Sequence, residues 1–322
     1  MERKKVKRLI KFKAIHNVIK ISRKIILPGF EGLSLYIVTK FFFKGINNGT
    51  LDMRAQSLAF SFFLALFPSI IFLFTLIPYI PIHNFQDSLF NLLQSLLPAS
   101  AFEATEGTIA DILKNPRGGL LSFGFISALY FSTNGFNAMM NAFNETYHDI
   151  ETRSALKQRL VSLIMVILST LLISVAIVLI LLSEWGLKML IEKEIVYYLI
   201  LLGKWAILIA LCFCFISFNY YLGPKRKKGF RFFSPGSILA TFLTILTSVL
   251  FAYYVNNFGN YNKLYGSIGT LIVIMLWIYI NSLILLLGFD LNASILTAKK
   301  KHGILASSTV KLGKKSRVLS SR

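Results

Sequence analysis

Several runs of 20 or more nearly uncharged apolar residues interrupt this chain, and they decide what it can fold into. The cleanest run extends from Leu160 to Leu182 and contains no charged residue. As an α-helix it would be about 34 Å long, enough for a hydrocarbon core of about 30 Å. Only 15% of the 322 residues are charged, against about 25% in an average soluble domain. We therefore predict a polytopic membrane protein, and we exclude a soluble enzyme, a disordered tail protein and a disulfide-stapled secreted domain.

Six runs have the length and composition of a membrane span. Helices are expected rather than strands, because the runs are continuous and show no alternation of outward and inward residues. The predicted fold class is an all-α membrane protein, built as a six-span transmembrane helical bundle. The predicted spans cover residues 53–80, 118–142, 159–183, 196–222, 236–258 and 267–291.

Two further stretches are expected to lie along the membrane surface. Residues 30–46 are apolar but are interrupted by Glu31, Lys40 and Lys44, which favours an interfacial elbow helix, with a seventh span as the alternative. Residues 84–114 carry acidic residues and a proline, and are expected to form two short amphipathic surface helices between spans one and two. The predicted organisation is a basic cytoplasmic N-terminal segment (1–29), a membrane domain (30–298) and a basic, disordered cytoplasmic tail (299–322).

The basic residues are divided unevenly between the two sides of the predicted bundle. With six spans, 29 of the 35 Lys and Arg residues fall on the side that holds both termini, and six fall on the opposite side or at its span ends. Loops rich in Lys and Arg stay in the cytoplasm. Both termini are therefore predicted to be cytoplasmic.

The same distribution accounts for the net charge of +21. Basic residues near a membrane surface attract anionic lipid headgroups at about 1 kcal/mol each, and these runs lack the interleaved aromatic residues of single-strand binders. Membrane lipids are therefore the predicted partners, and no nucleic acid is expected. No cofactor or metal ion is predicted, because Cys212 and Cys214 would point to roughly opposite sides of a helix and no phosphate-binding loop occurs.

The strongest polar pattern lies in span two. Its polar residues share an arc of about 100° when they are placed at helical spacing. An amide in hydrocarbon needs hydrogen-bond partners, so this face is not expected to meet lipid. Two interpretations stay open: helix fastening, which is preferred, or a polar path for a substrate. The residues are Ser127, Tyr130, Asn134, Asn137, Asn141 and Asn144.

Span six carries a second stripe of small and polar residues. Its glycines and threonine would permit close approach of a neighbouring helix, and Asn281 is its deepest polar group. Packing is again preferred over a path. The stripe comprises Gly266, Thr270, Trp277, Asn281, Gly288 and Asn292.

Four more residues stand out in the predicted spans. Asp52 opens span one, where the helix dipole favours a negative side chain, and Pro68 is expected to kink that helix. Lys204 in span four either snorkels to the outer headgroups or faces an anionic group such as a substrate phosphate. Asp290, near the end of span six, is expected to be solvated or paired with a basic neighbour.

Three segments together resemble the YihY/BrkB family of bacterial inner-membrane proteins. Residues 261–293 are similar to its C-terminal signature, although Phe289-Asp290 stands where the family usually has Ala-Glu. Residues 52–73 resemble the first span, and residues 134–147 resemble a region with an Asn and an aromatic residue. The positions that match include Asp52, Pro68, Tyr265, Gly266, Gly269, Trp277, Tyr279, Gly288 and Asp290.

The resemblance implies a six-span bundle in the bacterial inner membrane, with cytoplasmic termini and no catalytic residue set. Family members have been labelled as a ribonuclease and as virulence or serum-resistance factors, and a role in moving envelope lipids has been suggested. The leading hypothesis is a non-enzymatic transporter or export factor for a lipid or other amphiphilic envelope component. A structural scaffold is the alternative. A nuclease is disfavoured, because phosphodiester hydrolysis needs clustered carboxylates with a metal or His/Lys acid–base groups.

Overall fold

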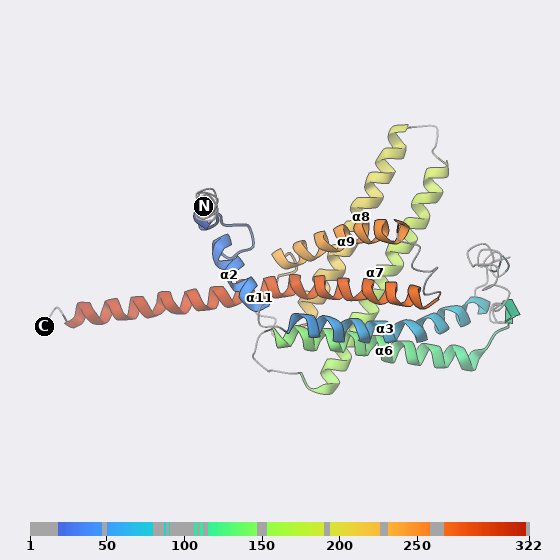
Figure 1. Cartoon of the computed structure of the whole chain (residues 1–322), viewed down its shortest axis with the longest axis horizontal. Helices are drawn as coiled ribbons and strands as arrows, with labels where there is room; N and C mark the ends of the chain where they lie inside the picture. Colours follow the sequence, from blue (N-terminus) through green and yellow to red (C-terminus); the bar gives the residue numbers. More distant parts are fainter. Residues whose placement is uncertain are drawn as a thin grey trace, which may run out of the picture.

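The protein is seen here as a computed structural model in which helices make up nearly every described segment (Figure 1). The structure describes residues 19–46, 50–79, 115–146, 153–189, 194–225, 231–257 and 267–319, with isolated positions between 87 and 111. These segments contain no strand, which confirms the all-α prediction. The elements are α2 (Leu35–Ile46), α3 (Leu51–Leu76), the 3-10 turn η1 (Ile77–Tyr79), α6 (Gly118–Glu145), α7 (Ala155–Met189), α8 (Glu194–Leu222), α9 (Pro235–Asn257) and α11 (Ser267–Leu319).

Each of the six predicted spans corresponds to a helix. Among the described residues, five helices are long and apolar enough to cross a membrane, so the chain has several transmembrane helices. The predicted second span, α6, is not one of the five, because four asparagines and four glycines lower its hydropathy. The count of six spans stays a prediction. The five apolar segments are Leu51–Tyr79, Ala155–Ile180, Tyr197–Leu222, Pro235–Val255 and Leu271–Lys301.

The long helices form a layer and a hairpin. In Figure 1, α3, α6, α9 and α11 lie alongside one another, whereas α7 and α8 cross this layer steeply and extend well beyond it. Within the layer, α3 packs against α6 and α11, and α9 packs against α11. The hairpin contacts the layer where α7 meets α6 and where α8 meets α9.

The main core lies where the hairpin joins the layer. The rings of Phe143 and Phe289 stack at 4.0 Å between centroids, and the fully buried Tyr220 packs against both. Beside them, α9 and α11 approach backbone to backbone, because a Cβ on Gly236 or Gly288 would collide with the opposite helix. Side chains from α3, α6, α8 and α11 therefore interlock at one end of the layer, as the small-residue stripe in span six had suggested.

Helix α2 lies within the stretch predicted as an elbow, but it begins at Leu35 rather than at residue 30. The preceding loop prevents an earlier start, since Gly29, Glu31 and Gly32 all have positive φ. Val38 on α2 is buried in a small cluster that includes Ile295 of α11. This docking fixes α2 against α11; its place at a membrane interface stays a prediction.

The C-terminal segment differs from the expectation. Residues 299–319 continue α11 as a helix, where the sequence had suggested a disordered tail. Extending an existing helix adds one hydrogen bond for each residue that is fixed, without a new nucleation step, and this long span supplies the nucleus. Other predictions lie outside the described residues: Tyr265, Gly266, most of the surface-helix stretch 84–114 and most of the segment 1–29.

Candidate functional site

A buried ion pair connects α3 to α11. Arg54 Nη2 lies 2.9 Å from Asp290 Oδ2, and the two residues are only 6% and 3% exposed. Arg54 stands one turn into α3, and Asp290 stands where α11 meets the main core. Asp290 was expected to be solvated or paired, and it is paired. Ionisable groups are costly in such surroundings unless they are paired, and they often mark functional positions.

Thr146 and a main-chain carbonyl complete this ionic cluster. Thr146 Oγ1 donates to Asp290 Oδ1 at 2.8 Å, and Arg54 Nη1 donates to the carbonyl oxygen of Ala142 at 3.0 Å. Arg54 Nη1 also donates to Thr146 Oγ1 at 2.5 Å. Three helices thus converge on one guanidinium group, and α3, α6 and α11 are held in fixed register at this end.

The ionic cluster holds the residue that sequence analysis missed. Arg54 had been counted only among the basic residues that set orientation, because it stands at the edge of the first apolar run. Its signal in the sequence was a lone arginine two residues after Asp52, with a carboxylate at position 290 in the family signature. The sequence around Arg54 or Asp290 does not indicate that the two side chains contact each other.

A second contact between α3 and α11 uses Asp52. Its carboxylate accepts hydrogen bonds from the hydroxyl of Tyr279 and, at 3.1 Å, from Gln56 Nε2. The residue lies in the first turn of α3, as the dipole argument required, and the N-cap residue before it is Thr50, whose side chain makes no cap hydrogen bond. Asp52 therefore links two positions of the family signature across two helices.

The polar stripe of α6 is divided between two uses. At its C-terminal half, Asn141 Oδ1 accepts a hydrogen bond from Gln158 Nε2 at 2.8 Å. Asn144 Oδ1 accepts one from the main-chain N–H of Lys225 at 3.2 Å. These two asparagines bind the layer to the start of α7 and to the end of the α8 segment, which is helix fastening.

The other half of the stripe lies beside an arginine of α7. The guanidinium of Arg159 lies 5.3 Å from the ring centroid of Tyr130 and donates to Thr133 Oγ1 at 3.1 Å. Asn134 and Asn137 are half-buried, and Asn137 Oδ1 is a buried atom with no hydrogen-bond partner among the described residues. We call Tyr130, Thr133, Asn141, Gln158 and Arg159 the polar seam between α6 and α7.

The stripe of span six faces α9. The Trp277 ring lies 4.6 Å from that of Phe251, and Gly288 meets Gly236. Asn292 Oδ1 accepts from the N–H of Gly236 at 2.8 Å, and its Nδ2 donates to Ser234 Oγ at 2.9 Å. Asn281 donates to the carbonyl of Trp277 in its own helix. These are packing contacts.

The remaining predicted residues lie apart from the polar seam. Lys204 is half-buried within α8, and Gly269 is buried near the start of α11. Pro68 is half-buried inside α3, which continues to Leu76. The structure therefore does not bring Lys204 together with the asparagines of the stripe.

The foot of the hairpin is held by one arginine. Arg153 donates to the carbonyl oxygens of Leu222, Gly223 and Pro224, at 3.0, 2.7 and 2.7 Å. Its partial burial lowers the pKa of the guanidinium. Tyr220 adds a hydrogen bond at 2.6 Å to the carbonyl of Leu285. The foot is thus fixed both to itself and to α11.

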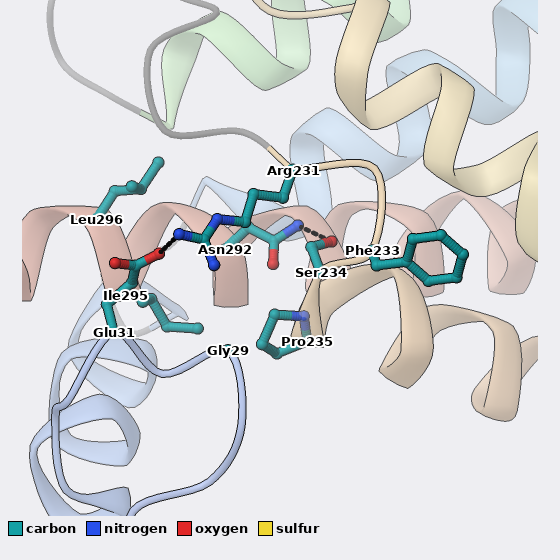
Figure 2. A pocket seen from close by; sticks show the side chains of 9 residues that line it. All are labelled: Gly29, Glu31, Arg231, Phe233, Ser234, Pro235, Asn292, Ile295 and Leu296. Carbon is teal, nitrogen blue, oxygen red and sulfur yellow. Dashed lines mark hydrogen bonds and ion pairs between the residues drawn. The ribbon is translucent and has the colours of Figure 1, made fainter.

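A pocket lies where the loop before α2, the turn before α9 and α11 meet (Figure 2). Glu31 accepts from Lys299 Nζ at 2.6 Å and forms an ion pair with Arg231 Nη2 at 3.2 Å. The hydrogen bond from Lys299 lowers the pKa of the Glu31 carboxyl; burial opposes this effect, and the charges of Lys299 and Arg231 lower it further. Neither this pocket nor a second one between α7 and α8 is lined by an asparagine of the α6 stripe.

Comparison with known proteins now adds to this geometry. The family model for virulence factor BrkB matches residues 42–309. A Bacillus subtilis (strain 168) protein described as ribonuclease-like, YfkH, is 35% identical over 77% of this chain and 90% of its own length. UPF0761 membrane protein NTHI0384 of Haemophilus influenzae (strain 86-028NP) is 24% identical over 79% of this chain and 93% of its own. No solved structure matches.

The name of the Bacillus relative raises the question of nuclease residues. In the described part of the chain, no three His, Cys, Asp or Glu side chains group closely enough to hold a metal ion. All four histidines are at positions 16, 83, 148 and 302; the first three lie outside the described segments, and the side chain of the fourth is not described. The chemistry that the described residues do provide is an ion-paired cluster, a polar seam and a cationic pocket.

Proposed function

From the premise that the chain belongs to the BrkB virulence-factor family of membrane proteins, we propose that it is a transport or export factor for a lipid or other amphiphilic envelope component. We place it in the bacterial inner membrane with both termini in the cytoplasm. The excess of Lys and Arg on the side of the termini supports this orientation.

The observation that carries the proposal is that interhelical hydrogen bonds account for only some of the asparagines in the α6 stripe. Fastening accounts for Asn141 and Asn144, but Asn137 Oδ1 is buried without a hydrogen-bond partner in the described part of the chain, and Asn134 lies on the same face. A buried polar atom without a partner destabilises the fold by about 1–3 kcal/mol. Such an atom is retained most readily where a substrate or water satisfies it at some stage of a cycle.

The surroundings of the polar seam suit an amphiphile. Arg159 supplies a half-buried cation between Tyr130 and Thr133, which an anionic headgroup would contact. Beyond the seam, α7 presents exposed apolar side chains such as Ile167 and Leu171, each 58% exposed. A headgroup on the seam with its acyl chains against α7 would therefore satisfy both kinds of surface.

The test is a lipid-redistribution assay in reconstituted vesicles with a fluorescent phospholipid. Asn137→Leu is expected to slow redistribution while the free energy of unfolding stays unchanged or rises by up to about 1–3 kcal/mol, because the variant lacks the unpartnered buried atom. Leu222 lies at the end of α8, away from the asparagine face of α6. Leu222→Met is the control, a conservative change near the core. If Asn134→Leu and Asn137→Leu both leave redistribution unchanged, the polar-path hypothesis is wrong.

A scaffold without transport activity is the second candidate. The interhelical hydrogen bonds of Asn141 and Asn144 favour it, because they show that part of the stripe does fasten helices. Under this hypothesis, leucine variants of Asn134, Asn137, Asn141 and Asn144 all lower stability and expression together. Vesicles with wild-type protein then redistribute no more lipid than empty vesicles do.

A further inference from the structure

The pocket of Figure 2 combines a concave surface with a cation, Arg231, and an exposed aromatic ring. A second cation, Lys299, does not line the pocket but pairs with its carboxylate, Glu31. Arg231 and Lys299 are 69% and 56% exposed, whereas Glu31 between them is 18% exposed. Phe233, which also lines the pocket, is 73% exposed. These are the surface features that a phosphate group joined to an apolar chain requires.

The two cations are not fully used by their shared carboxylate. Arg231 reaches Glu31 through Nη2 at 3.2 Å, while a guanidinium carries five N–H donors. Lys299 carries three donors and gives one to Glu31. With one negative and two positive groups, the cluster has a net positive charge, and its donors belong to exposed side chains.

The loop that carries Glu31 has an unusual backbone conformation. Glu31 itself has φ +55°, between Gly29 at +85° and Gly32 at +80°. A residue with a Cβ is unfavourable in this left-handed region. The loop is also pressed onto α9, since a Cβ on Gly29 would lie 2.8 Å from Pro235 Cγ. A strained loop therefore holds a carboxylate against two cations on other elements.

We propose that this pocket binds the phosphate of an anionic phospholipid, and that Glu31 occupies the phosphate position when lipid is absent. On binding, Arg231 and Lys299 exchange the carboxylate for phosphate oxygens, and the acyl chain lies against Phe233. Arginine and lysine are both established binders of phosphate groups. This inference rests on the proposed function for its purpose, as a substrate-loading site, but binding is measured without transport.

Other polar groups of the pocket are already satisfied and are not assigned to the ligand. Asn292 bonds to Gly236 and Ser234, and Ser234 also bonds to Ser237. The assignment therefore concerns Glu31, Arg231 and Lys299 alone. It predicts that changing Glu31 strengthens lipid binding and that changing Arg231 or Lys299 weakens it. A general attraction of the basic surface to lipid predicts no larger effect at these three residues than at other exposed charged residues.

The experiment titrates full-length protein in detergent micelles with short-chain phosphatidylglycerol and measures lipid binding by native mass spectrometry. Arg231→Gln and Lys299→Gln are each expected to weaken binding about five-fold, and Glu31→Gln to strengthen it about five-fold. The controls are two exposed residues outside the pocket, Lys300→Gln beside Lys299 in the sequence and Glu145→Gln at the end of α6, which are expected to change binding less than two-fold.

Separate arms identify the source of the phosphate. Inorganic phosphate at equal concentration is expected to compete poorly, because it lacks the apolar contact with Phe233; equal competition would assign the pocket to soluble phosphate and overturn the lipid proposal. Phe233→Ser tests the apolar contact directly and is expected to weaken binding of the lipid but not of inorganic phosphate. If Lys300→Gln weakens binding as much as Lys299→Gln does, the attraction is general and the site is wrong.

Two outcomes separate this site from the proposed function. Lipid redistribution that persists with unchanged lipid binding in Arg231→Gln overturns the pocket alone. Residue-specific binding in vesicles that show no redistribution would support the pocket and reject transport. Should Glu31→Gln fail to fold, the Arg231→Gln and Lys299→Gln double variant decides, since it is expected to lose binding by at least ten-fold.

Discussion

The end of the layer that holds Arg54 and the outer half of the α7–α8 hairpin are built on different principles. At the first, which we call the packed centre, Arg54, Phe143, Tyr220, Phe289 and Asp290 are all buried and contact one another across helices. Along the hairpin beyond this end, large apolar side chains point outward. In the most apolar stretch of α11, 22% of the residues are buried, whereas in that of α8 only 6% are buried.

The difference shows where specificity and where solubility in lipid are encoded. In the packed centre, each helix is fixed by polar groups that have few alternative partners and by glycines that admit no side chain. In the outer hairpin, any apolar residue exposed to lipid would serve. Mutations should therefore have large, residue-specific effects at the centre and small effects on the hairpin.

The largest effect is expected from breaking the buried ion pair. Arg54→Leu leaves Asp290 charged and buried without its cation, which is expected to lower the free energy of unfolding by about 3–5 kcal/mol. The measurement is denaturant unfolding in mixed micelles. In the Arg54→Met, Asp290→Leu double variant, both charges are gone, and most of this stability should return; a double variant as unstable as the single one would show that the ion pair is needed for more than charge balance.

The glycines give the next contrast, within one type of substitution. In Gly288→Ala, the new Cβ would lie 2.6 Å from the Gly236 carbonyl oxygen and 2.7 Å from Ala240 Cβ, so a loss of about 1–3 kcal/mol is expected. In Gly203→Ala in α8, the new Cβ would have no neighbouring atom within 4 Å among the described residues outside its own helical turn, so the variant should be neutral or stabilising by up to about 1 kcal/mol. Equal melting temperatures for the two variants would contradict the contrast.

The foot of the hairpin should respond to an intermediate degree. Arg153→Ala removes three hydrogen bonds to main-chain carbonyls at the end of α8, and a loss of about 1–2 kcal/mol is expected. Lys157→Ala, an exposed cation in the first turn of α7, is the control. Protease sensitivity of the α8–α9 connection measures the effect; cleavage at the same rate in both variants would show that Arg153 does not hold the foot.

The smallest effect on stability is expected from Glu31, in the pocket of Figure 2. Because its folded-state pKa is lowered, its stabilising contribution is complete above the ordinary carboxyl pKa and disappears as the pH falls through the lowered value. Between pH 7 and pH 3, the wild type should therefore lose up to about 1 kcal/mol more stability than Glu31→Gln does. Parallel melting curves of the two proteins over this range would show that the ion pairs contribute nothing.

Particular residues show how far the sequence determines this fold. The long uncharged run after Leu160 predicts a span without any tertiary information, because the bilayer acts on each helix separately. Gly288 could likewise be assigned to a packing stripe from helical spacing alone. Helix periodicity is a local property, so spans and faces were predictable and are found as helices with those faces in contact.

Pairing between helices was not predictable in the same way. Arg54 and Asp290 lie 236 residues apart, and nothing in either segment specifies the other as its partner. The asparagines of α6 share one face by spacing, yet Asn141 contacts Gln158, while Asn137 Oδ1 meets no donor within the segments that the structure describes. Which polar residue fastens a helix depends on where the neighbouring helix crosses, and the steep crossing of α7 decided that.

The most direct test of the central claim is to close the polar seam covalently. Asn141 and Gln158 fasten α6 to α7 in the structure, and the account requires this contact to open when lipid passes. In a variant with Cys212 and Cys214 replaced by Ser, Asn141→Cys and Gln158→Cys would therefore be joined by a short thiol-cleavable crosslinker that holds α6 and α7 together. We expect lipid redistribution in vesicles to stop on crosslinking and to return on reduction. Redistribution that continues at the same rate in fully crosslinked protein would contradict the claim that lipid moves along this seam.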